Sequence, residues 1–114
     1  TKAINLNIAE IYKAVSPNLG VIDGYEGMEG RGPISGGPVN FRVAAASLYP
    51  VSLDAVIAKI MGFNPLEIGY LYHLTKQGIG AADLSKIEII GVSPEEVTRE
   101  FEPHPTYYEQ LEWR

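Results

Sequence analysis

An acidic, glycine-dense stretch runs from residue 21 to residue 38 and reads VIDGYEGMEGRGPISGGP. Six of the 12 glycines of the chain fall in it, together with acids at regular spacing: Asp23, Glu26 and Glu29. An apolar run precedes the stretch and another follows it, so the pattern predicts a long, shaped loop that joins two strands. Ordered loops of this length usually carry a site or a contact. The sequence therefore predicts that a functional site, if the chain has one, lies at residues 23–38.

Length and composition exclude several classes of protein. A chain of 114 residues is expected to form one domain. It contains no cysteine, which excludes disulfides, thiolate metal sites, iron–sulfur ligation and a cysteine nucleophile within the chain. The net charge of −5 and the scattered lysines and arginines argue against a nucleic-acid partner. No apolar run reaches the length of a bilayer span, so we expect no membrane partner and a cytoplasmic location.

Hydrophobic periodicity predicts four helices and three strands. An apolar stripe of Ile4, Ile8, Ile11, Tyr12 and Val15 predicts a helix over residues 3–15. The other predicted helices cover residues 52–61, 65–78 and 94–100, and the predicted strands cover 19–22, 41–48 and 86–90. A strand–helix–helix–strand unit from 41 to 90 favours a right-handed crossover between parallel strands. The expected fold class is α/β, with a small mixed or parallel sheet of about three strands and helices packed on it.

The chain ends in a segment rich in aromatic residues and prolines. We expect a single domain over residues 1–102 and a C-terminal tail over residues 103–114. The tail contains His104, Tyr107, Tyr108 and Trp113. Disordered tails are poor in aromatic residues, so this one is expected to dock on the chain itself or on a neighbour. The chain begins with Thr1, and we expect it to be an excised part of a larger parent domain.

The loop offers two kinds of ligand group. Asp23, Glu26 and Glu29 are possible oxygen ligands for Mg²⁺ or Ca²⁺, although the spacing of an EF-hand is absent and no metal site is assigned. The alternative is that they are solvated loop acids, with Asp23 accepting hydrogen bonds from nearby backbone amides.

The second kind of group would bind an anion. Gly30 and Gly32 flank Arg31, and backbone amides in such a segment can cradle a phosphate or carboxylate. Neither nucleotide-binding glycine motif is present, and a purely structural loop whose glycines take positive φ is the alternative. Asp54, expected in the first turn of a helix capped by Ser52, is a further candidate if that helix start faces the loop.

Several motifs together resemble the domain of unknown function 362 family. They are Asp23-Gly24 at a strand end, Met28-Glu29-Gly30-Arg31-Gly32-Pro33 in the loop, Leu53-Asp54-Ala55-Val56 in a helix, and Ile87 to Gly91. The resemblance covers about Ile8 to Gly91. It implies the C-terminal portion of a larger domain in an uncharacterised prokaryotic protein, in a group whose members often carry an iron–sulfur module. No cofactor is expected in this chain, and a cluster would lie outside it.

Two hypotheses about function follow. In the first, the chain is the ligand-binding or catalytic portion of an iron–sulfur-associated redox protein, and the loop 23–38 binds an unknown small ligand. In the second, the chain is a non-catalytic structural or interaction module. Its loop and aromatic tail then contact the remainder of the parent protein or a second copy, and a homo-oligomer is possible. The sequence predicts no particular reaction.

Overall fold

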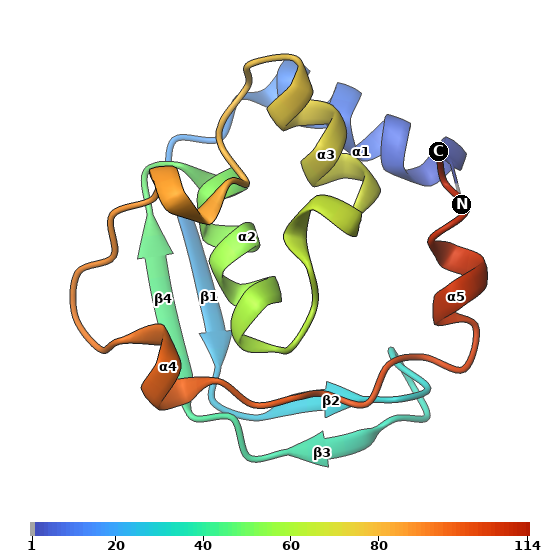
Figure 1. Ribbon diagram of the computed structural model, residues 1–114, viewed down its shortest axis with the longest axis vertical. Helices are drawn as coiled ribbons and strands as arrows, with labels where there is room; N and C mark the ends of the chain where they lie inside the picture. The colour runs from blue at the N-terminus through green and yellow to red at the C-terminus, as the bar shows by residue number, and fades with distance from the viewer. Residues whose placement is uncertain (1) are drawn as a thin grey trace.

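A computed structural model describes residues 2–114. Figure 1 shows their helices and strands, coloured from the N-terminus to the C-terminus. The α-helices are α1 (Lys2–Val15), α2 (Pro50–Ile60), α3 (Gly69–Lys76), α4 (Pro94–Val97) and α5 (Tyr107–Gln110). The strands are β1 (Gly20–Gly24), β2 (Gly27–Glu29), β3 (Gly37–Val39) and β4 (Val43–Ser47). Two 3₁₀ turns, η1 (Pro65–Glu67) and η2 (Leu84–Lys86), complete the fold. The α/β class is confirmed.

The four strands form one long, bent β-ribbon. β1 pairs with β4, and β2 pairs with β3, both antiparallel. Figure 1 shows the ribbon turning sharply between the two pairs. At the turn Arg42 has a positive φ of 58°, its amide donates to the Tyr25 carbonyl at 3.0 Å, and its guanidinium lies 3.6 Å from the centre of the Tyr25 ring. The stretch predicted as a loop therefore contains a hairpin.

The predicted sheet of about three parallel or mixed strands is wrong in its details. There are two antiparallel sheets of two strands each, because the hairpin between β1 and β4 brings these strands side by side. The expected strand 86–90 is not formed, and neither is the parallel crossover. Residues 84–86 form η2, and Ile90 after it is 92% exposed. Residues 86–90 have β-forming side chains, but they do not pair with any described strand.

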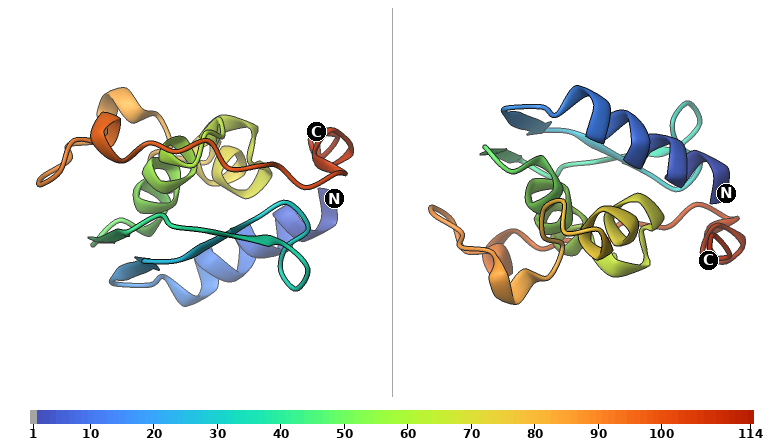
Figure 2. Two further views of the ribbon diagram at one scale, coloured as in Figure 1. Left: turned by 90° about the horizontal axis from the view of Figure 1, so that it is seen from below. Right: turned by 90° about the horizontal axis from the view of Figure 1, so that it is seen from above.

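Helix α2 lies at the centre of the molecule and contributes to two apolar clusters. One side of α2 packs with α1 and α3 in a cluster that contains Ala9, Val51, Ala55, Leu71, Leu74 and Ala82. The other side packs with the β-ribbon and the C-terminal segment in a cluster that contains Val39, Phe41, Leu53, Ile57, Ile60 and Phe101. In the views from below and from above, α1 lies at one side of the molecule and α4 at the opposite side (Figure 2).

Helix α1 has the predicted position but presents its apolar stripe outward. Ile4, Ile8, Ile11 and Val15 are 57%, 40%, 62% and 67% exposed. The inner side of the helix is lined by the small, buried Ala9 and by the part-buried Asn5 and Tyr12. Asn5 Oδ1 accepts a hydrogen bond of 3.0 Å from the Tyr70 amide at the start of α3. Of the stripe predicted as core, Tyr12 is therefore part-buried, and the four aliphatic side chains are surface in this chain.

The C-terminal tail docks on the chain, as predicted. Trp113 is 2% exposed, and its indole N–H donates to the Glu67 carbonyl at 2.6 Å. Its ring centre lies 5.1 Å from that of Tyr72 and 5.3 Å from that of His73. Aromatic pairs at these separations add to the hydrophobic contribution of the buried area. The tail therefore closes over η1 and α3.

Candidate functional site

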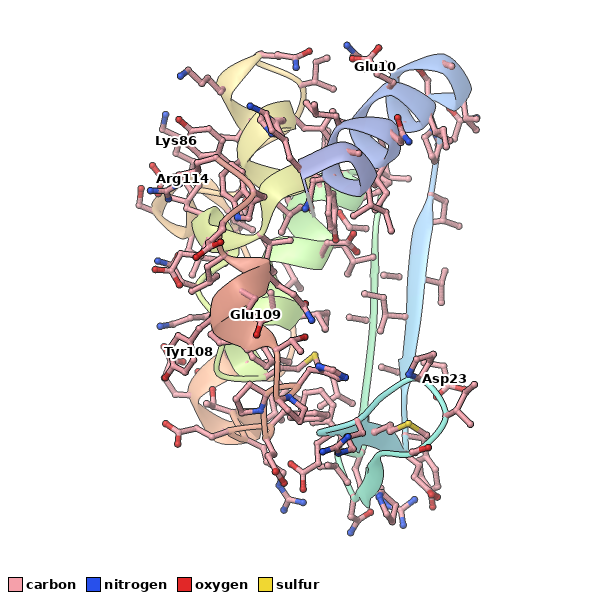
Figure 3. All side chains as sticks on the ribbon, turned by 90° about the vertical axis from the view of Figure 1, so that its right-hand side faces the viewer. Glu10, Asp23, Lys86, Tyr108, Glu109 and Arg114 are labelled. Atoms are coloured by element: carbon pink, nitrogen blue, oxygen red, sulfur yellow. The ribbon has the colours of Figure 1, made fainter. Side chains whose placement is uncertain are left out.

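The loop acids do not converge on a common point. Asp23 Oδ1 accepts a hydrogen bond of 3.0 Å from the Tyr25 amide, the local turn that short acidic side chains favour. Glu26 is exposed, and Figure 3 shows Asp23 at the outer end of β1, where the ribbon bends. Among residues 2–114, no group of three His, Cys, Asp or Glu side chains is placed to hold a metal ion.

Glu29 and Gly30 bind the chain's own C-terminal segment. Glu29 Oε2 accepts a hydrogen bond of 2.8 Å from the Glu102 amide, and the Gly30 amide donates one of 2.8 Å to the Glu102 carbonyl. Gly30 has a φ of +73°, a conformation that glycine adopts without strain. The groups that sequence analysis offered to a ligand therefore have partners within the chain.

Arg31 and Gly32 lie at the tip of the hairpin and are exposed. The Arg31 carbonyl accepts a hydrogen bond of 3.0 Å from the Ser35 amide, and the Gly32–Pro33 peptide is cis. The two cavities described below have no lining residue between 23 and 38. Neither of these two cavities therefore lies at the predicted anion cradle.

Asp54 lies elsewhere, in α2, where it lines a cavity that no residue of the loop 23–38 lines. The helix begins at Pro50 rather than at Ser52, because proline fits the first helical position, and Ser52 instead donates to the Ala81 carbonyl at 2.8 Å. Asp54 Oδ2 accepts a hydrogen bond of 2.8 Å from the Tyr70 hydroxyl. Burial raises the pKa of Asp54, and the hydrogen bond from Tyr70 opposes that rise.

This pair lines a cleft between α1, α2 and α3. The cleft has a volume of about 290 Å³, and its walls also include Ile8, Tyr12, Pro17, Pro50, Val51 and Leu74. Burial and the nearby Asp54 carboxylate raise the pKa of the Tyr70 phenol strongly. Tyr12 was predicted only as part of the apolar stripe of the first helix, and Tyr70 was not predicted as a site residue, because no local motif shows that it meets an acid from another helix.

A larger open groove of about 410 Å³ lies between β4, α2 and the segment 87–92. Its floor is apolar and includes Leu53, Val56, Ile57 and Ile60, while its only ionisable lining residues are Arg42 and Glu88. Because β4 pairs only with β1, its other edge faces this groove. The groove offers a surface for packing and no cluster of acids or bases.

Comparison with known proteins identifies the family. Residues 1–59 match the family described as "Domain of unknown function (DUF362)". The chain is also 34% identical over 80 residues to "Thylakoid-associated protein sll1697" of Synechocystis sp. (strain ATCC 27184 / PCC 6803 / Kazusa), a match that covers 68% of this chain and 25% of that protein. The chain thus spans only part of the length of this relative, and no solved structure matches.

None of the helices formed by residues 2–114 combines the length and the hydropathy needed to cross a bilayer. The family match begins at α1 and extends to the last turn of α2, so it includes the whole β-ribbon with the Met28–Pro33 motif and the helix that carries Asp54. The matched region therefore contains both of the places where site residues were expected. The chain belongs to the DUF362 family, which is defined by a domain of unknown function.

Proposed function

We propose that this chain is a packing module of a larger DUF362 protein, in which another part of the same polypeptide covers its outer apolar surface. We use the name outer surface for the exposed apolar side chains of α1, of the outer face of the β1–β4 sheet and of the residues that flank this sheet. It consists of Ile4, Ile8, Ile11, Val15, Leu19, Val21 and Leu48.

The observation that carries this proposal is the outward apolar stripe of α1. Four aliphatic side chains at helical spacing are 40% to 67% exposed. Amphipathic helices normally turn such a stripe toward a core, and monomeric proteins seldom expose large contiguous apolar patches. Helix α1 thus packs one side on α3 and leaves an apolar side uncovered, which a partner segment could bury.

The sheet supports the same reading. Val21 lies opposite Ala46 in the register, and both are exposed on the face turned away from α2. Figure 3 shows β1 at the outer side of the molecule, below the end of α1. Because the sheet has only two strands, each also has an unpaired edge. Two-stranded sheets are usually stabilised by further strands or by a covering layer.

The proposed partner is a segment of the same polypeptide. The match with the Synechocystis protein covers 25% of that protein, so most of the relative lies outside the matched part. A second copy of the chain is the competing partner. It would bury the same residues, but only in a manner that depends on protein concentration.

The loop is not favoured as a ligand site, because the Glu29 carboxylate and the Gly30 amide already bind the Glu102 backbone. An attached iron–sulfur module and a cytoplasmic location remain predictions from the family resemblance and from composition. Since the chain has no cysteine, such a cluster would take its thiolate ligands from elsewhere.

Cysteine labelling, read out on the peptides of residues 1–114, tests the proposal, because this part of the polypeptide has no native thiol to interfere. Ile11→Cys places a thiol on the outer surface, and Glu10→Cys places one on α1 away from the apolar stripe. In chain 1–114 both thiols should react rapidly with a maleimide. In the whole polypeptide translated from the gene, Ile11→Cys should be protected at least tenfold while Glu10→Cys still reacts. Equal reactivity of Ile11→Cys in both proteins, or protection that disappears on dilution, would contradict the proposal.

A further inference from the structure

We propose that the cleft between α1, α2 and α3 binds a small organic ammonium ion, with Asp54 as its anionic partner. This inference concerns chain 1–114 itself, and of the residues of the outer surface only Ile8 also lines the cleft. It rests on three features of the cleft: a carboxylate without a counter-ion, aromatic walls and an apolar interior.

The carboxylate of Asp54 has capacity for a further partner. Its Oδ2 accepts the Tyr70 hydroxyl, and no hydrogen bond to Oδ1 is present among residues 2–114. The ion pair found in the described part of the chain joins Lys13 to Glu10, at 2.5 Å. Asp54 therefore has no lysine or arginine beside it. A partly buried carboxylate in this state is stabilised by an incoming cation.

The walls determine which kind of cation fits. Tyr12 and Tyr70 both line the cleft, and tyrosine rings attract ammonium groups through their negative faces. Ile8, Val51 and Leu74 supply apolar surface against which a hydrocarbon chain can pack. The volume of about 290 Å³ limits the ligand to a small molecule.

Other ligand classes suit the cleft less well. Ca²⁺ and Mg²⁺ require several oxygen ligands, whereas one carboxylate lines this cleft. An anion would meet the Asp54 carboxylate and find no cationic side chain. An alkylammonium ion matches both halves of the site, because its N–H groups donate to Asp54 Oδ1 and its carbon chain lies on the apolar wall.

Titration followed by nuclear magnetic resonance provides the test. Uniformly ¹⁵N-labelled chain 1–114 is titrated with n-butylammonium chloride, and separately with n-butanol at equal ionic strength. The ammonium ion should shift the amide signals of residues that line the cleft, with Asp54 and Tyr70 among them, and n-butanol should bind at least tenfold more weakly. Asp54→Asn, which keeps an oxygen to accept the Tyr70 hydroxyl, should weaken butylammonium binding at least tenfold. Asp83→Asn, a carboxylate outside the cleft, should leave it unchanged.

Two results would overturn the proposal. One is equal binding of butylammonium and butanol, which would identify the cleft as an apolar pocket only. The other is unchanged butylammonium binding by a folded Asp54→Asn variant, which would assign the cation to another site. The amide spectrum of the free Asp54→Asn variant shows whether it is folded. Loss of binding because the carboxylate is missing is thereby distinguished from loss of binding because the variant is unfolded.

Discussion

The Tyr70 hydroxyl lies 2.8 Å from Asp54 Oδ2 and donates a hydrogen bond to it, joining α3 to α2 beside the cleft. The two residues are 16 positions apart and lie on helices that cross. The same stretch of α3 receives Asn5 of α1, whose Oδ1 accepts from the Tyr70 amide at 3.0 Å. Tyr70 of α3 is therefore hydrogen-bonded to both of the other helices around the cleft.

Asp54→Asn should change how stability depends on pH. Burial raises the pKa of Asp54 in the folded protein above its ordinary value of 3.8, so the folded state binds this proton more tightly than the unfolded state does. The stabilisation from that proton is complete below the unfolded pKa and is lost as pH rises through the folded pKa. At pH 7 the variant should therefore be at least as stable as the wild type. Urea unfolding at several pH values from 3 to 7 measures this, and a variant that loses stability relative to wild type as pH rises would contradict it.

Trp113→Ala should destabilise the fold strongly. The side chain is 2% exposed, and its removal leaves a cavity against Tyr72 and His73 as well as an unpaired Glu67 carbonyl. Substitutions of this kind cost about 3 kcal/mol or more in the free energy of unfolding. Tyr108→Ala is the matched control, because Tyr108 belongs to the same tail but is 80% exposed. Equal effects of the two variants in urea unfolding would show that the tail does not dock as described.

Glu29→Ala should lower stability by about 1 kcal/mol, because the Glu102 amide loses its acceptor. Glu26→Ala, an exposed acid in the same hairpin, should change stability by less than about 0.5 kcal/mol. Thermal unfolding of both variants separates a structural role for Glu29 from a role in ligand binding. If Glu29→Ala and Glu26→Ala are equally stable, Glu29 remains available to a ligand.

Gly27→Ala and Gly37→Ala form a matched pair in the β2–β3 hairpin. A Cβ atom at position 27 would lie 2.8 Å from the Phe101 ring, whereas one at position 37 has no neighbour within 4 Å. The first substitution should therefore cost about 1 to 3 kcal/mol through overpacking, and the second should be nearly neutral. Chemical denaturation of the two variants measures the difference. A neutral Gly27→Ala would mean that the hairpin does not press on the C-terminal segment.

Local features of the chain were largely predictable from its sequence. The limits of α1 and the docking of the aromatic tail follow from periodicity and composition. Each of these features depends on neighbouring residues or on the overall balance of apolar side chains.

Features that depend on distant residues were not predictable. The residues 86–90 have strand-forming side chains, but strand formation needs a partner edge, and only the tertiary arrangement decides whether one is near. The stripe of α1 has the periodicity of a buried face, and periodicity does not say whether the partner belongs to the same chain. The Asp54–Tyr70 pair joins two helices whose crossing is set by packing, which no local motif encodes.

The effect of Ile11→Ser in two contexts tests the central proposal most directly. In chain 1–114 Ile11 is 62% exposed, so the substitution should change the free energy of unfolding by less than about 0.5 kcal/mol. In the whole polypeptide the same side chain should be buried, and its replacement should cost about 2 kcal/mol, with Glu10→Ser neutral in both proteins. If Ile11→Ser is neutral in the whole polypeptide as well, the outer surface is not covered by that polypeptide, and the proposal that this chain is a packing module is wrong.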